Sequence, residues 1–109
     1  MLIAYVTVNV LQEKRIEFEQ TVFALQREFR QATGCLKYDV YKDTEQDTDY
    51  FLIGKWQNQE MLESHLQATG FDVLLGAINN LCEPSEVKYR IASLLENTQL
   101  PDVLDISNI

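Results

Sequence analysis

The residue types best suited to chemistry are rare in this chain. It has one tryptophan and one histidine, Trp56 and His65, only nine residues apart. A neutral imidazole titrates near physiological pH and can act as a general base, for example toward a phenolic hydroxyl. An indole offers a flat wall on which an aromatic ring can stack, and one N–H donor. The pair is therefore a candidate for a reactive pocket.

A structural interpretation of the same two residues is also open. His65 follows Met61 by four residues and Leu62 by three, which places it on or beside the apolar stripe of a helix. Trp56 ends a β-like run and could simply pack under that helix. A core role and a binding role are compatible for Trp56, whereas His65 would be either a base or a packing residue.

Asn9 is a third candidate for chemistry. Tyr5, Thr7 and Asn9 alternate along the first strand-like run and therefore share one face. The Asn9 amide could bind a substrate oxygen or stabilise reduced oxygen. It could equally end the strand at the surface, and the sequence leaves both interpretations open.

The pattern of cysteines and acids does not predict a metal site. Cys35 and Cys82 are far apart in the sequence and form no Cys-x-x-Cys pair. With only one histidine in the chain, there are too few soft ligands for a zinc site. The acidic stretch 43–49 lacks the glycine and terminal glutamate of an EF-hand, so we interpret it as a solvated loop. We expect two reduced, packed thiols and no metal site.

Composition limits the class of protein. The 109 residues fit one domain, with 46% hydrophobic and 24% charged residues. The net charge of −8 and the absence of a Lys/Arg cluster argue against a nucleic acid or an anionic membrane as partner. The apolar N-terminus has no basic segment and no cleavage site, so it predicts a strand and a cytoplasmic protein.

Periodicity predicts the elements that must position these residues. Alternation indicates strands at 2–10, 35–43, 49–57 and 83–93, and a spacing of three and four residues indicates a helix over 13–33. A second helix begins after Asn58, is interrupted near Gly70 and continues to about Asn80. The order β-α-β-β-α-β predicts an α+β, ferredoxin-like fold with a four-stranded antiparallel sheet. We expect a domain at 1–95 and a C-terminal tail at 96–109 that docks on a partner subunit.

The predicted topology leaves one face of the sheet without helices. That face carries Ile3 and Tyr5, which are too apolar for a solvated surface. A second copy of the chain would cover it, so the topology predicts a homodimer whose sheets pack face to face.

Several short motifs in this order resemble the antibiotic biosynthesis monooxygenase (ABM) superfamily of dimeric α/β barrels. The resemblance covers residues 2–92 and includes a Gly-Cys-x-x-Tyr strand, a strand ending in Trp, a Leu-x-x-His-Leu helix and a Glu-Pro before the last strand. The residues that carry it are Gly34, Cys35, Tyr38, Trp56, Leu62, His65, Leu66, Phe71, Glu83 and Pro84.

The resemblance implies a function and a site. Members of the family include small cytoplasmic dimers that oxidise quinol-like or phenolic substrates with molecular oxygen and without metal or flavin. Their pocket lies between sheet and helices and is lined by a first-strand Asn, the strand-ending Trp and aromatic or His residues. Carried over to this chain, His65 and Asn9 would be catalytic, and Trp56, Tyr5 and Phe71 would bind a small aromatic substrate.

The chain also departs from the family pattern. Gly54 stands where the family usually has Glu, and Gly70 where a second His often follows the first. Leu75 occupies the region of the axial His of the haem-degrading branch, which argues against haem degradation. The alternative to an oxygenase is therefore a catalytically silent dimeric module that binds a small molecule or has a structural role.

Overall fold

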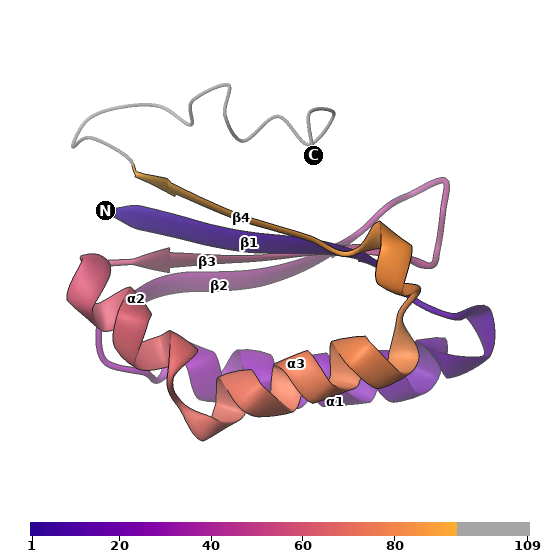
Figure 1. Ribbon diagram of the computed structural model, residues 1–109, viewed down its shortest axis with the longest axis horizontal. Helices are drawn as coiled ribbons and strands as arrows, with labels where there is room; N and C mark the ends of the chain where they lie inside the picture. The colour runs from indigo at the N-terminus through magenta and orange to yellow at the C-terminus, as the bar shows by residue number, and fades with distance from the viewer. Residues whose placement is uncertain (94–109) are drawn as a thin grey trace.

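A computed structural model describes residues 1–93 as a four-stranded sheet with helices on one face. Figure 1 shows α1 and α3 running side by side beneath the sheet, with α2 near the end of β3. The elements, in chain order, are β1 (Leu2–Asn9), η1 (Gln12–Lys14), α1 (Arg15–Arg30), β2 (Cys35–Lys42), β3 (Asp49–Trp56), α2 (Gln59–Leu66), α3 (Thr69–Leu81), η2 (Pro84–Glu86) and β4 (Lys88–Ser93).

The sheet has the order β2-β3-β1-β4, and every neighbouring pair is antiparallel. This is the predicted α+β, ferredoxin-like arrangement. The predicted tail at 96–109 lies outside the described residues. No helix in the described part of the chain is long and apolar enough to cross a membrane.

Local signals lie near the helix ends, although α1, predicted over 13–33, spans only Arg15–Arg30. Gly34 has a φ of +83° after α1, a conformation that favours glycine. The Asn58 side chain caps α2 by accepting a hydrogen bond from the Met61 backbone N–H at 2.9 Å. The predicted interruption occurs slightly earlier, at 67–68 between α2 and α3, and Gly70 is the second residue of α3. The last strand is shorter than predicted because Pro84 starts a 3₁₀ turn, so pairing with β1 covers only Lys88–Ser93.

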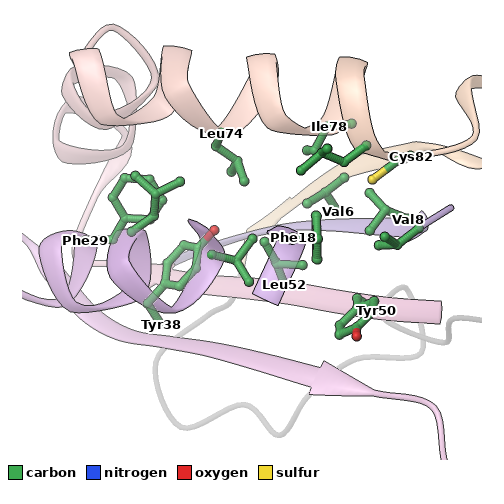
Figure 2. Close-up of a cluster of buried hydrophobic side chains, with 14 of the residues drawn as sticks. Val6, Val8, Phe18, Phe29, Tyr38, Tyr50, Leu52, Leu74, Ile78 and Cys82 are labelled. Atoms are coloured by element: carbon green, nitrogen blue, oxygen red, sulfur yellow. The ribbon is translucent and has the colours of Figure 1, made fainter. Parts of the chain in front are cut away.

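Strand register decides which residues share a face. Leu2 pairs with Trp56 and Ala4 with Gly54, so even-numbered residues of β1 and β3 point to the same side. On that side, Val6, Val8 and Leu52 meet side chains of α1 and α3 in the main core, which Figure 2 shows in close-up. The outer face carries a second, smaller cluster that consists of Ile3, Tyr5, Phe51 and Ile53.

Candidate functional site

A pocket of about 260 Å³ lies on the helix-covered side of the sheet. Strands β1 to β4 supply its floor, and α2 and α3 supply its other wall. The residues that line it are Ala4, Tyr5, Val6, Tyr38, Leu52, Trp56, His65, Leu66, Phe71, Leu74, Tyr89, Arg90 and Ile91. Most are aliphatic or aromatic, as in a typical site for a small organic ligand.

Trp56 and His65, which the sequence singled out, meet in this pocket. Their rings are stacked, with centroids 4.3 Å apart and an angle of 27° between the planes. The imidazole also meets Phe29 edge-on at 4.5 Å and Phe71 at 5.4 Å. Four aromatic neighbours, counting Tyr38 at 6.3 Å, therefore surround the only histidine of the chain.

Burial sets the protonation state of His65. Its side chain lies among these rings, and desolvation lowers its pKa to about 4 because the charged form loses hydration. No described residue forms a hydrogen bond with the imidazole. At neutral pH, His65 is therefore an uncharged ring that can donate one hydrogen bond and accept another, but is a weak base.

Two further polar groups line the pocket without a protein partner. The indole Nε1 of Trp56 is the one fully buried side-chain nitrogen or oxygen in the described residues that lacks a hydrogen bond. Tyr38 is also buried, and desolvation raises its pKa above the ordinary value. Figure 2 shows its hydroxyl directed from β2 into the layer between sheet and helices. A buried donor without a partner costs about 1–3 kcal/mol, which a bound ligand oxygen could recover.

Gly54 makes room for this arrangement. A Cβ atom built at this position would lie 2.8 Å from the Trp56 Nε1 and 2.9 Å from the Tyr38 Cδ2. A glycine inside a strand is typical either of a bulge or of a close approach by another group. The structure shows a close approach, whereas the bulge lies in β2 between Cys35 and Lys37.

Gly70 is equally constrained. A Cβ atom there would collide with the Glu28 carboxylate and would lie 2.9 Å from the Phe29 Cε1. The Glu and His that the family often has at these two positions therefore do not fit this packing. The contact between α1 and the start of α3 occupies the space that the second His would need.

Asn9 lies away from the pocket. It is at the far end of β1 from Leu2, the residue that pairs with Trp56, and seven residues of strand span about 23 Å. Its amide nitrogen donates to Thr48 Oγ1 at 3.1 Å and to Asp49 Oδ1 at 2.6 Å, which ties β1 to the start of β3. The structure does not bring Asn9 together with His65.

Tyr5 contributes to the pocket differently from the other predicted residues. It is among the lining residues, but its ring packs against Phe51 on the outer face, with centroids 5.2 Å apart. What Tyr5 offers the pocket is therefore its backbone. Tyr38, Leu74 and Ile91 also line the pocket but were not among the predicted site residues, because their position there depends on strand register and helix packing rather than on a local sequence signal.

A second hollow, of about 700 Å³, lies over the outer face of the sheet. It has charged and polar walls, including Lys37, Lys55, Asp49 and Asn9, around the ring of Phe51. It is larger than the inner pocket but contains none of Trp56, His65 or Phe71. No group of three or more His, Cys, Asp or Glu within residues 1–93 could hold a metal ion.

The comparison with known proteins agrees with the fold. The sequence profile of the family named antibiotic biosynthesis monooxygenase matches residues 1–74, more than half of the chain. The chain belongs to this family. Among functionally curated proteins, none is similar enough in sequence to count as a relative.

Solved structures of the family share the fold at low sequence identity. A putative antibiotic biosynthesis monooxygenase from Deinococcus radiodurans is 21% identical, with a TM-score of 0.79 over 93% of this chain and 99% of that one. A putative member from Nitrosomonas europaea is 16% identical, with a TM-score of 0.78 over 87% and 99%. SnoaB, a cofactor-independent oxygenase from Streptomyces nogalater, is 17% identical, with a TM-score of 0.73 over 92% and 97%.

Proposed function

We propose that this ABM protein is a cofactor-independent monooxygenase that acts on a small aromatic, quinol-like substrate in the inner pocket. The observation that carries the proposal is the set of polar groups without protein partners, Trp56 Nε1, His65 and the Tyr38 hydroxyl, in an otherwise apolar pocket. A flat hydroxyaromatic ring would stack between aromatic walls while its oxygens met these groups. Phe71 would close the ring site from α3.

The proposed reaction needs only molecular oxygen as co-substrate. A phenolic ring and O₂ give a quinone and water: one oxygen atom becomes the new ring carbonyl, the other leaves as water, and the ring supplies all the electrons. His65 would accept the hydrogen bond of the substrate hydroxyl. Loss of an electron to oxygen makes a phenolic hydroxyl far more acidic, so even a weak base such as His65 can take the proton at that step.

The direct test records oxygen uptake by the purified, metal-free protein with a panel of hydroquinones and naphthols. We expect uptake above the autoxidation background and incorporation of one atom of labelled oxygen into the product. Trp56→Phe keeps an aromatic wall but loses the N–H, and His65→Gln keeps hydrogen bonding but loses the base. Both should reduce turnover, whereas Asn9→Ser should not. Uptake no faster than without protein, for every compound of the panel, would reject the enzyme.

A catalytically silent binding module remains the second candidate. The observation that favours it is the tight packing around Gly54 and Gly70, which leaves no room for the Glu and His typical of the family. Such a module would bind an aromatic ligand beside Trp56 without consuming oxygen. Trp56 fluorescence, measured in parallel with oxygen uptake, distinguishes the binding module from the oxygenase. The module would change the fluorescence on ligand binding without consuming oxygen.

We also propose a cytoplasmic homodimer that forms through the outer face of the sheet. The apolar cluster of Ile3, Tyr5, Phe51 and Ile53 supplies the hydrophobic centre that such an interface needs. Lys37 and Lys55 lie at one end of this face and Asp49 at the other, so a two-fold axis that lies in the interface and runs across the strands would place opposite charges together. Sedimentation should show a dimer, and Ile53→Lys should weaken it by at least about tenfold in Kd. A native monomer at micromolar concentration would contradict this assembly.

A further inference from the structure

Within residues 1–93, no positively charged side chain faces the interior of the inner pocket. Its one charged lining residue is Arg90, which pairs with Tyr5 in the sheet register and therefore belongs to the outer face. The Arg90 side chain is exposed, and its Nη1 donates to the Tyr89 carbonyl oxygen at 2.7 Å. The titratable groups around the pocket are otherwise Tyr5, Tyr38, His65 and Tyr89, and α3 contributes none.

The polar groups of the pocket are neutral at physiological pH. Burial holds the pKa of His65 at about 4 and raises the pKa of both Tyr38 and Tyr89. The Trp56 indole is a donor without charge. A phenolate that entered would exchange its hydration for a few neutral dipoles and no counter-ion, which is a costly transfer. A neutral hydroxyl would lose much less and would find a donor and an acceptor.

We infer that this pocket takes hydroxyaromatic ligands in their neutral, protonated form and excludes the corresponding anions. The inference rests on the proposed function, because it assumes that the pocket binds aromatic hydroxyl compounds. It adds a selection rule: a bound hydroxyl keeps its proton more firmly than it does in water. In an oxygenase of this kind, the proton would leave together with the electron rather than before it.

The test uses 4-nitrophenol, whose neutral and anionic forms absorb at different wavelengths. The probe is held at a pH equal to its own pKa, and the full-length protein is titrated into it. We expect the anion band to fall and the neutral band to rise in a saturable way. Preference for the neutral form should raise the apparent pKa of the bound probe by about one unit, a tenfold selectivity.

Two exposed isoleucines provide matched variants. Ile91 lines the pocket from β4 and is 60% exposed, so Ile91→Lys adds a cation at the pocket with little risk to folding. Ile16 on α1 is 71% exposed and does not line the pocket, so Ile16→Lys adds the same charge elsewhere. Ile91→Lys should reduce or reverse the spectral change, and Ile16→Lys should leave it as in the natural protein.

The possible results separate the inference from the proposed function. A rise of the anion band, or quenching of Trp56 fluorescence with no change in the ratio of the two bands, would overturn the selection of neutral ligands. Either result would leave the aromatic site in place. No change in absorbance and no response of Trp56 would reject the aromatic site, and the inference with it.

Discussion

The two faces of the sheet carry different kinds of residue. The inner face meets the helices and holds the stacked Trp56 and His65 in an apolar pocket. The outer face carries the small cluster around Tyr5 and Phe51, with lysines and acids beside it. Chemically useful groups on the inner face are desolvated and lack partners, whereas Asn9 on the outer face is already hydrogen-bonded. This difference supports the two proposals made above, a ligand site on the inner face and a dimer interface on the outer face.

The largest expected effect is on the free energy of unfolding, and it appears when one aromatic residue from each face is replaced by alanine. Phe29 is 2% exposed and packs against both Tyr38 and His65, so Phe29→Ala should cost about 3–5 kcal/mol of unfolding free energy. Phe51 is only partly buried, so Phe51→Ala should cost about 1 kcal/mol in the dissociated protein. Urea denaturation at low protein concentration measures both. Equal losses would mean that the two faces do not differ in packing as described.

The second effect is the dependence of stability on pH. Because the folded-state pKa of His65 is about 4 and its ordinary value is 6.5, the unfolded chain binds more protons between these values. Stability should therefore fall as the pH falls through this window, with up to about 3 kcal/mol of the loss caused by His65.

The matched variant for this effect is His65→Gln. It should lose less stability than the natural protein between pH 7 and pH 4, since the carboxylates that also titrate there are common to both. Parallel profiles would show that His65 titrates alike in the folded and unfolded chains.

The third comparison concerns two glycines. Gly54→Ala would force a methyl group against Trp56 and Tyr38, and overpacking of this kind costs about 1–3 kcal/mol. Gly76→Ala, inside α3 with nothing within 4 Å of the new atom, should stabilise the protein by about 0.5–1 kcal/mol. Thermal unfolding and the Trp56 emission spectrum report both. If the Gly54→Ala protein is as stable as the natural one and has the same emission, Trp56 and Tyr38 do not pack closely against Gly54.

The smallest expected effect is that of Asn9→Ala. The loss of the hydrogen bonds to Thr48 and Asp49 should cost about 1 kcal/mol of stability. Ligand affinity in the inner pocket should not change, because Asn9 lies at the other end of β1. A clear loss of affinity without loss of stability would restore Asn9 to the site.

The sequence could predict the fold because its signals were local. Alternation in the strands, Gly34 after the first helix and the cap at Asn58 each depend on a few neighbouring residues. The site was only partly predictable because it depends on strand register. Nothing in the sequence states that Leu2 pairs with Trp56, and without that pairing the even-numbered side of β1 cannot be matched to Trp56. For this reason Tyr5 and Asn9 looked equivalent to Trp56 as site residues, although their side chains occupy the opposite face.

The meaning of Gly54 and Gly70 also required the structure. In the sequence they are departures from a family pattern, which could be chance replacements. In the fold, a Cβ atom at either position would lie within 3 Å of a buried aromatic side chain, so that neither position can hold the family residue without repacking. Close contacts between elements distant in sequence, such as α1 against the start of α3, leave no local signal that would reveal this.

The proposed function requires an aromatic hydroxyl compound to bind beside Trp56 and His65 on the inner face. The chain has a single tryptophan, so its indole N–H gives one resolved signal in a proton–nitrogen NMR spectrum of the labelled protein. When a hydroquinone or naphthol from the panel is titrated in, this signal should move downfield and saturate as Nε1 gains an acceptor. The side-chain amide of Asn9 should stay in place. If the signals of Asn9 and other outer-face residues shift while the indole signal stays fixed, the ligand does not bind beside Trp56 on the inner face.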